Sequence, residues 1–383
     1  MLDLFHDDSH RALAATAARF VDTNIRPYAE AWEEAGSFPS DLAVRAGAAG
    51  LLGPTYPESV GGGGGDVFHG LVVAEALVRG GSVGTAMGLG SHAIALPPIL
   101  ALGTDAQKER FVRPVVAGTR VAALAITEPS GGSDVARVRT RAVRDGDHYV
   151  VSGQKTYITS GGRADYVVTA VRTGAPDSGH AGLSLLVIER GTPGFTSGPP
   201  LRKMGWWASD TTELFFDDCR VPAANLIGAE NFGFYAIMAN FAQERLLIAA
   251  TCVAMAAEAI RLTERHVRER EAFGRRIGDF QVIRHRLAEM RTREAEARSF
   301  VAVVAERHRR GEDVTAWVAM AKNAAVSACS FVTDAAVQLH GGLGYMRECG
   351  VERLYRDARL FAIGGGTTEI MNEIIHRFAP TSR

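Results

Sequence analysis

The sequence predicts an α+β chain of three parts, in which two helical regions flank a region of strands. Apolar residues recur at helical spacing up to about residue 120, and from Val121 they fall into short alternating runs rich in β-branched and aromatic residues. Helical spacing returns at Phe232. We therefore expect an N-terminal all-helical domain at 1–120, a middle antiparallel β-domain at 121–232, built as a small barrel or sandwich, and a C-terminal helical bundle at 233–383.

The helices of the first domain are expected in five segments. The first covers residues 9–35, and Ser9 is placed to cap its start. The others are expected at 40–52, 67–79, 92–102 and 105–117. The glycine run at 61–65 favours a loop, because glycine is unfavourable inside helices and strands.

The middle domain contains seven runs of strand-forming residues separated by turns. Asp145-Gly146 stands between two alternating runs and predicts a hairpin. After this domain, helices are expected at 231–269, 281–311, 314–340 and 367–378, with a glycine-broken loop before the last. The expected strands are 121–127, 137–143, 148–153, 157–159, 165–173, 183–189 and 213–222.

Composition excludes several classes of protein. The 383 residues carry a formal net charge of -1 and are 46% hydrophobic, which favours a globular protein and provides no basic surface for nucleic acid. No stretch offers the roughly eighteen uninterrupted apolar residues of a membrane span, and the N-terminus lacks a signal-peptide pattern. We therefore expect a cytoplasmic protein. Because its four cysteines are widely spaced, we expect neither disulfides nor a structural metal. The cysteines are Cys219, Cys252, Cys329 and Cys349.

The long apolar segment at 231–261 contains the first candidate for chemistry. Almost its only charged side chains before the last turn are Glu244 and Arg245. Apolar residues surround this pair on every face of a helix, so we expect burial to raise the pKa of Glu244, as in an enzyme's general base. The alternative is an ion pair that ties this helix to its neighbours.

A second candidate is the segment from Thr127 to Asp134, which follows the first predicted strand. Its glycines and small residues allow close approach of a flat or phosphorylated ligand, and its free N–H groups and hydroxyls can bind oxygen atoms. It lacks the GxGxxG and GxxxxGK[ST] spacings, so neither a nicotinamide-binding fold nor a P-loop is supported. Taken alone, such a segment is more often a plain turn.

Six motifs in one order along the chain resemble the acyl-CoA dehydrogenase family. They are AITEPSGGSDVARVRTRA (125–142), SGQKTYITSGGRADY (152–166), KMGWWASDTTELFFDDCRVP (203–222), REREAFGRRIGDFQ (268–281), QLHGGLGYMRE (338–348) and YRDARLFAIGGGTTEIM (355–371). The resemblance implies a helical domain, a β-barrel domain and a four-helix bundle. It also implies bound FAD and removal of two hydrogens from the α and β carbons of an acyl-CoA to give a trans-2-enoyl-CoA.

The resemblance also implies which residues bind the cofactor. One group lines the flavin, and within it Ser133 also lies near the CoA portion of the substrate and Thr159 near flavin N5. A second group reaches the FAD of a neighbouring subunit, which implies a homotetramer with shared sites. The first group is Leu124, Ile126, Thr127, Gly132, Ser133, Tyr157, Ile158 and Thr159, and the second is Arg270, Phe273, Gln281, Gln338, Gly341 and Gly342.

The position of the base separates two groups within the family. Many members have it in a Tyr-Glu-Gly-Thr loop, where this chain has Gly365 and no side chain. Others, similar to long-chain and isovaleryl-CoA dehydrogenases, have a glutamate before an arginine on the long helix, as in Gln243-Glu244-Arg245. The resemblance therefore implies Glu244 as the base that removes the α-proton.

The glycine loop and the start of the last helix complete the implied site. The backbone N–H of Gly365 is implied to bind the thioester oxygen, Gly366 to contact substrate, and Thr367 and Glu369 to lie where free N–H groups meet flavin or substrate. Glu369 is alternatively a substitute base or, with Gly366, part of a capping arrangement. Arg245 is expected near the CoA moiety or as the partner that orients Glu244.

The implied activity is acyl-CoA dehydrogenation with an electron-transferring flavoprotein as acceptor, in fatty acid metabolism. The pattern favours medium to long acyl chains, and Trp206-Trp207 either narrows an entrance or packs under a loop. Two alternatives are an oxidase or monooxygenase of the same fold that uses O2, and a non-catalytic FAD-binding assembly protein.

Overall fold

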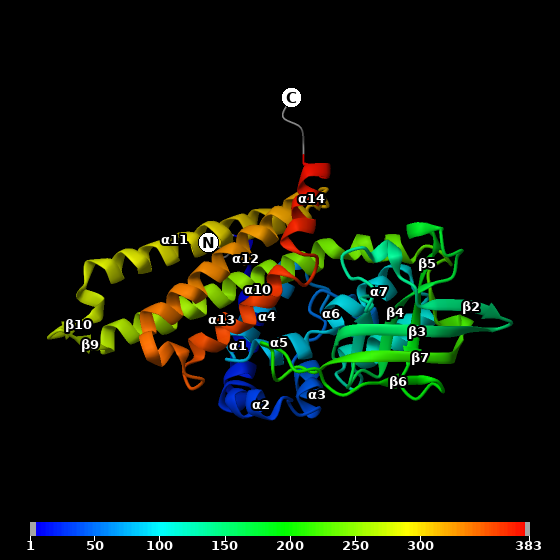
Figure 1. Cartoon of the computed structure of the whole chain (residues 1–383), viewed down its shortest axis with the longest axis horizontal. Coiled ribbons are helices and arrows are strands. Elements are labelled where there is room, and N and C mark those ends of the chain that lie inside the picture. The colour runs from blue at the N-terminus through cyan, green and yellow to red at the C-terminus, as the bar shows by residue number, and fades with distance from the viewer. Residues whose placement is uncertain (1–4, 380–383) are drawn as a thin grey trace.

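The structure is a computed structural model that describes residues 5–379. In Figure 1, the strands gather at one end of the molecule, the long helices extend to the other, and the N-terminal helices lie between and beneath them. The order of helices, strands and helices is the predicted one, and the three-part α+β architecture is confirmed. The expectations for residues 1–4 and 380–383 lie outside the described residues.

The N-terminal part is helical up to Val116, with a π-helical turn at Lys108–Val112 between its last two helices. The predicted helix at 9–35 is broken by a 3₁₀ turn at Arg26–Tyr28, because Pro27 cannot continue a regular helix. A short helix at 83–89 was not predicted. The helices are α1 (Asp8–Asn24), α2 (Ala29–Ala35), α3 (Asp41–Ala48), α4 (Val67–Val78), α5 (Val83–Leu89), α6 (His92–Ala95), α7 (Pro97–Leu102), α8 (Asp105–Gln107) and α9 (Arg113–Val116).

The cap of α1 differs from the prediction. Asp7, not Ser9, is the N-cap, and its carboxylate accepts hydrogen bonds from the N–H groups of Ser9 and His10. A carboxylate two residues earlier reaches these free N–H groups better than the Ser9 hydroxyl does. Asp66 caps α4 in the same manner and also lies 2.8 Å from Nε2 of His10.

These two caps join α1 to α4. The rings of His10 and His69 lie 4.0 Å apart, and ligand-type atoms of His10, Asp66 and His69 all lie within 4.8 Å of one another. One nitrogen of each ring already accepts a hydrogen bond from the N–H of its own cap residue. The group therefore serves as a structural link between the two helices.

The middle part is one sheet with the order β6-β7-β3-β2-β4-β5-β8, in which β1 pairs with β4. Pairing is mostly antiparallel, as predicted, but β1 and β2 both run parallel to β4. The path ends at β6 and β8, so the sheet is open and not a fully closed barrel. The strands are β1 (Ala122–Ala125), β2 (Arg141–Asp145), β3 (His148–Thr159), β4 (Tyr166–Arg172), β5 (Leu183–Glu189), β6 (Phe195–Ser197), β7 (Thr211–Pro222) and β8 (Leu226–Ile227).

The Asp145-Gly146 hairpin is confirmed, since Asp145 pairs with His148 and Gly146 has a φ of +62°. The two runs predicted at 148–153 and 157–159 form a single strand, β3. Its pairing with β7 shifts register twice, between Val151 and Gly153 and between Lys155 and Ile158. The second irregularity directs the end of β3 toward the functional site.

The C-terminal part is built on three long helices. α10 packs along α12, and α11 covers both. The loop expected between α12 and the last helix contains a helix, α13. The elements are α10 (Gly233–Glu269), β9 (Glu271–Ala272), β10 (Arg275–Arg276), α11 (Gln281–Arg309), α12 (Thr315–His340), α13 (Gly350–Ala358) and α14 (Thr368–Phe378).

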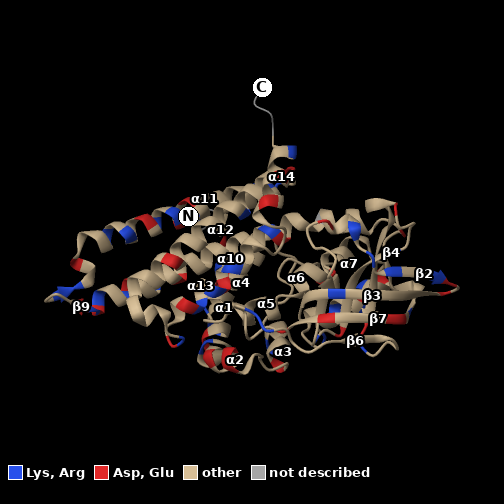
Figure 2. Cartoon of the chain, in the orientation of Figure 1, with Lys and Arg blue, Asp and Glu red and all other residues tan. Residues whose placement is uncertain are grey.

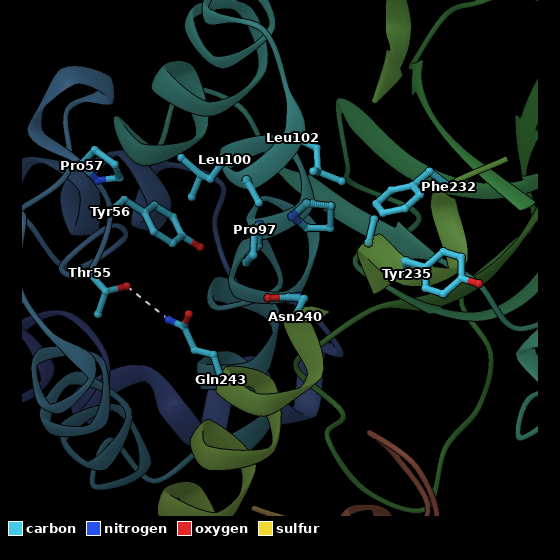
Figure 3. Close-up of a pocket in the computed structure, with 13 residues that line it drawn as sticks. Thr55, Tyr56, Pro57, Pro97, Leu100, Leu102, Phe232, Tyr235, Asn240 and Gln243 are labelled. Carbon is cyan, nitrogen blue, oxygen red and sulfur yellow. Dashed lines mark hydrogen bonds between the residues drawn. The ribbon is translucent and has the colours of Figure 1, made fainter. Parts of the chain in front are cut away.

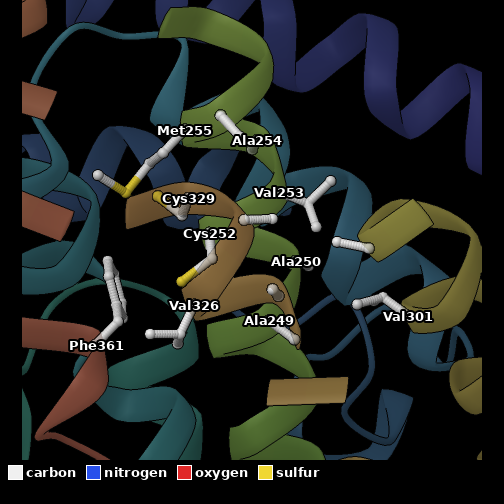
Figure 4. Close-up of a cluster of buried hydrophobic side chains, with 14 of the residues drawn as sticks. Ala249, Ala250, Cys252, Val253, Ala254, Met255, Val301, Val326, Cys329 and Phe361 are labelled. Atoms are coloured by element: carbon white, nitrogen blue, oxygen red, sulfur yellow. The ribbon is translucent and has the colours of Figure 1, made fainter. Parts of the chain in front are cut away.

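The crossing of α10 and α12 forms the main core. Cys252 and Cys329 face each other there with Val326 and Phe361 beside them, all at most 6% exposed (Figure 4). Charged residues are spread along α11, whereas α12 is largely uncharged (Figure 2). The interface between α10 and α12 is therefore buried and apolar, and a charged side chain within it requires a hydrogen-bond or ion-pair partner.

α10 is more apolar than expected from the sequence, in which no uninterrupted apolar stretch of membrane-spanning length was found. By length and composition, this helix is sufficient to cross a membrane, but 67% of its apolar window is buried inside the protein. A central core helix of a globular protein has the same property.

Candidate active site

A cavity of about 900 Å³ is lined by all three parts of the chain. Its walls come from α4 and α5, the loop after β1, the end of β3, the middle of α10 and the glycine loop before α14. Folding thus brings together distant segments that were predicted separately. The predicted site residues in the wall are Thr127, Gly132, Ser133, Tyr157, Thr159, Glu244, Gly365, Gly366 and Thr367.

Glu244 contributes a carboxylate to the cavity from the middle of α10. Its Oε2 is shielded from solvent and accepts no hydrogen bond. Burial raises the pKa of Glu244 to about 7, and the positive charges of Arg245 and Lys322 oppose this rise without cancelling it. A carboxylate with a pKa near neutral is suited to accept a proton from a bound molecule.

Arg245 does not form the ion pair with Glu244 that was the alternative interpretation. In the part of the chain that the structure describes, Glu244 has no salt bridge within 4.0 Å. The buried guanidinium of Arg245 lies 4.7 Å from the centre of the Phe241 ring, and its Nε is 3.5 Å from the carbonyl oxygen of Gly365. Arg245 thus connects α10 to the glycine loop.

The glycine loop passes close to Glu244. Gly365 and Gly366 have φ values of +65° and +90°, which favour glycine. A Cβ on Gly365 would stand 2.4 Å from Cδ1 of Ile248 and 3.4 Å from Oε1 of Glu244. The loop therefore has no room for a side chain here, and its backbone faces the carboxylate directly.

The start of α14 differs from the capping arrangement predicted for Gly366 and Glu369. Thr367 is the N-cap, and its side chain accepts a hydrogen bond from the N–H of Ile370. Glu369 is exposed, and hydrogen bonds from its own N–H and from Thr367 hold its pKa below the usual range. An exposed carboxylate with a lowered pKa is poorly suited to act as a general base.

The loop after β1 is anchored by a buried carboxylate. Glu128 accepts hydrogen bonds from the Thr140 N–H at 2.8 Å and from Nζ of Lys155 at 2.9 Å. This anchor leaves residues 131–133 exposed along the cavity, with Thr127 behind them. The loop after β1 is consequently a fixed rim and not a free turn.

Tyr157 and Thr159 face the cavity from the end of β3. Tyr157 has a φ of +60° and remains 69% exposed, which is unusual for an aromatic ring in a cavity wall. The exposed ring, the small residues of the loop after β1 and the two threonines form an open cradle for a flat ligand. Ile158 is 3% exposed and packs into the core of the sheet, so its side chain does not reach this cradle.

Several predicted residues lie away from the cavity. Leu124 and Ile126 pack against the core between β1 and the N-terminal helices. The rings of His266 and His340 stack at 4.3 Å and bring the ends of α10 and α12 together, beside the β9–β10 hairpin at the left of Figure 1. The six residues implied to reach the FAD of a neighbouring subunit are exposed at this end, far from the sheet. They are Arg270, Phe273, Gln281, Gln338, Gly341 and Gly342.

The two tryptophans have different positions. Trp206 is buried and lines the cavity, and its backbone N–H donates to Asp357 Oδ1 at 2.7 Å. Trp207 packs between the guanidinium groups of Arg347 and Arg356, at 4.3 and 3.7 Å from its ring. The first residue therefore belongs to the wall, and the second packs away from the cavity.

A second cavity of about 580 Å³ adjoins the first across α10. Nε2 of Gln243 and the hydroxyl of Thr55 lie 3.4 Å apart between them (Figure 3). Leu100, Leu102 and Phe232 contribute apolar surface to this outer cavity. Its wall contains no charged side chain among the described residues.

The sequence did not single out two sets of residues at the site. Lys322 of α12 is 1% exposed and donates from Nζ to the carbonyl of Gly366. The inner end of the cavity is lined by apolar side chains of α4 and α5, among them Val73, Leu77 and Met87. Lys322 is one of only two Lys, Arg, Asp or Glu residues in α12, and a charge in such an apolar segment could have been singled out from the sequence.

Comparison with known proteins gives the family. Three family models match the chain: "Acyl-CoA dehydrogenase, N-terminal domain" at 7–119, "middle domain" at 123–219 and "C-terminal domain" at 231–379. The chain belongs to the acyl-CoA dehydrogenase family. A long-chain specific acyl-CoA dehydrogenase of Rattus norvegicus is 40% identical over 369 residues, which are 96% of this chain and 86% of that protein.

Solved structures of acyl-CoA dehydrogenases agree with this assignment. One from Geobacillus kaustophilus has a TM-score of 0.93 at 41% identity, over 97% of this chain and 98% of that one. A glutaryl-CoA dehydrogenase from Mycobacterium smegmatis, solved with FADH2, has a TM-score of 0.92 at 26% identity, over 98% and 95%. Acyl-CoA dehydrogenases are FAD-dependent oxidoreductases, and the cradle beside Tyr157 fits a flat flavin ring.

Proposed function

We propose that this acyl-CoA dehydrogenase removes the α-proton and the β-hydride of a medium- to long-chain acyl-CoA, with Glu244 as the base. The observation that carries this proposal is a shielded carboxylate with a pKa of about 7 that faces a glycine loop without side chains. The loop position that is implied to hold the base in many family members is Gly365 in this chain, which has no side chain. Glu244 is therefore the carboxylate available to the substrate.

The α-proton of a thioester is too weakly acidic for a carboxylate alone. Donors that stabilise negative charge on the thioester oxygen lower this barrier, and removal of one such donor typically costs about 10²–10³ in rate. The backbone of Gly365 passes beside the carboxylate of Glu244, so its N–H suits this task. Glu244 then removes the proton while the loop holds the oxygen.

The FAD used by this family supplies the two-electron acceptor for the hydride that leaves the β-carbon. Thr127, Gly132, Ser133, Tyr157 and Thr159 would hold its ring system at the open cradle. Glu244 accepts the α-proton and keeps it, since the pKa of its carboxyl is raised to about 7. Oε2 of Glu244 is shielded from solvent, and this burial maintains the raised pKa of the carboxyl.

The inner cavity wall supports an extended acyl chain. Val73, Leu77 and Met87 line the part between α4 and α5 and offer apolar surface without charge. Burial of each CH2 group against such a surface contributes about 0.8 kcal/mol. Longer acyl chains therefore gain affinity until the cavity is filled.

Assembly and electron transfer complete the proposal. The exposed residues at the β9–β10 end cannot reach the cradle of their own chain, which supports their contact with FAD of another subunit in a homotetramer. The aromatic ring of Phe273 is 94% exposed and is suited to such an interface. An electron-transferring flavoprotein would accept the electrons.

The test is an anaerobic titration of the flavin-loaded protein with saturated acyl-CoAs of several chain lengths, monitored by visible absorbance. Wild type should lose its flavin absorbance, and Glu244→Gln should keep bound flavin but stay oxidised. Equal bleaching of both proteins would exclude Glu244 as the base. Oxidised flavin in wild type with every acyl-CoA would favour the non-catalytic alternative, and rapid reoxidation by O2 alone would favour an oxidase.

A further inference from the structure

A buried lysine holds the glycine loop from the side of α12. Lys322 is 1% exposed, and the other charged residue of α12, Asp334, lies more than three turns away along the helix and is exposed. Burial of an ammonium group is unfavourable unless it is hydrogen-bonded. Its Nζ donates to the carbonyl oxygen of Gly366, so the structure uses this cation at the loop.

The loop needs such a contact because its residues are glycines. Gly364, Gly365 and Gly366 have no Cβ to restrict them, and glycine loses more conformational freedom on folding than any other residue. Two cationic side chains donate hydrogen bonds to consecutive carbonyl oxygens of the loop. Arg245 donates to the carbonyl of Gly365, and Lys322 donates to the carbonyl of Gly366. In a planar trans peptide the C=O of one residue is fixed relative to the N–H of the next, so these two contacts fix the peptide planes that follow Gly365 and Gly366. They therefore restrain the chain directly after the N–H of Gly365.

The lysine also lies close to the base. The Cε of Lys322 and the Oε1 of Glu244 stand 3.7 and 3.4 Å from the point that a Cβ of Gly365 would occupy. The charged or titratable groups that influence Lys322 are Glu244, Arg245 and Cys252, all on α10. One ammonium group therefore acts on the loop through a hydrogen bond and on the carboxylate through its charge.

We propose that Lys322 is a positioning residue, which holds residues 364–366 in the conformation that binds the thioester oxygen and places its positive charge beside the Glu244 carboxylate. The inference rests on the proposed function and adds to it a residue that does not line the cavity. Lysine suits this position because its compact ammonium group has three donors on a flexible stem that passes between packed helices.

The test compares Lys322→Met, Lys322→Arg and a matched control, Asn323→Ala. Methionine removes the charge and the donor at similar length, and arginine keeps the charge. Asn323 is the next residue of α12, and its Nδ2 donates to the carbonyl of Thr368 at 3.3 Å and to Asn372 at 2.9 Å. Its removal therefore weakens the contact with α14 and leaves the Gly366 carbonyl bound.

The first readout is amide hydrogen exchange of peptides that cover residues 360–370 in the flavin-loaded protein, which does not depend on turnover. Loss of one hydrogen bond of about 1 kcal/mol should speed exchange about fivefold in Lys322→Met. Exchange of this segment at the wild-type rate in Lys322→Met would overturn the proposed positioning role.

The second readout is the pH dependence of kcat and KM with one acyl-CoA. Lys322→Met should lower kcat by about tenfold to a hundredfold with little change in KM, since the contact matters most when negative charge develops on the oxygen. Loss of the nearby cation raises the pKa of Glu244, so the acid limb of the profile should move up by about one pH unit. Lys322→Arg and Asn323→Ala should keep the wild-type limb.

The outcomes separate this inference from the proposed function. If wild type is active and Lys322→Met has the same kcat and the same acid limb of the pH profile, the role of Lys322 is refuted. The proposed dehydrogenation then still stands. Wild type that no acyl-CoA reduces refutes the proposed function, while the exchange measurement still decides whether Lys322 holds the loop.

Discussion

Replacement of Glu244 by glutamine should stabilise the folded protein at alkaline pH. The pKa of this carboxyl is about 7 in the folded protein against an ordinary value of 4.5. Between these values the folded state binds a proton that the unfolded state releases, so wild-type stability falls as pH rises through this window. Glutamine has almost the same shape and does not titrate.

The magnitude follows from the size of the pKa shift. One pKa unit corresponds to about 1.36 kcal/mol. Linkage over this shift makes the stability of Glu244→Gln relative to wild type larger at pH 8.5 than at pH 5 by about 2–3 kcal/mol. Any constant cost of burying the amide is the same at both pH values and cancels in this comparison.

Urea unfolding of the flavin-loaded proteins at pH 5, 7 and 8.5, followed by tryptophan fluorescence at one protein concentration, measures this difference. Glu369→Gln is the matched control, because that carboxylate is exposed and its pKa is lowered, not raised. It should show no gain in stability with rising pH. Parallel stability curves for wild type and Glu244→Gln across the three pH values would refute a raised pKa at position 244.

Four further outcomes are expected. In wild type, kcat/KM should fall below pH about 7 as Glu244 takes up a proton, and a flat profile down to pH 5 would contradict its role as base. Gly365→Ala should lower kcat at least tenfold in steady-state assays, because its Cβ would stand 2.4 Å from a side-chain carbon, whereas Gly364→Ala, whose nearest contact would be 3.7 Å, should lower kcat much less. Ala74→Phe in the inner wall should reduce kcat/KM for long acyl-CoAs more than for short ones, and equal losses at all lengths would show that the chain lies elsewhere. Asp66→Ala should cost about 1–2 kcal/mol in urea unfolding, because it removes the cap of α4 and its bond to α1; an unchanged midpoint would contradict that link.

Much of the fold was accessible from the sequence, because long periodic segments and a strong turn signal are local properties. The long apolar helix and the Asp145-Gly146 hairpin are examples. The helix at 83–89 and the strand at 195–197 are short, and tertiary packing decides whether such segments become regular. The cap at Asp7 was missed because two residues two positions apart could serve as caps.

The site was predicted best where a residue was unusual in its own segment. Glu244 stood out as a charge among apolar residues, and the same reasoning applied to α12 would have selected Lys322. Strand alternation would have shown that Ile158 faces away from Tyr157 and Thr159. The partners of Lys322 could not be foreseen, because the contact between α12 and the glycine loop depends on tertiary packing.

The missing side chain at position 365 has a consequence for how these enzymes can change. In the proposed mechanism the helix α10 supplies the base, and the glycine loop, held by Arg245 and Lys322, supplies the donor for the thioester oxygen. Returning the carboxylate to the loop would require more than exchanging two residues, because Ile248 occupies the space where a Cβ would begin. A glutamate at 365 could be accommodated only after a third change, at Ile248. Packing around Ile248, and not the chemistry of the carboxylate, therefore separates the proposed arrangement from one with the base in the loop.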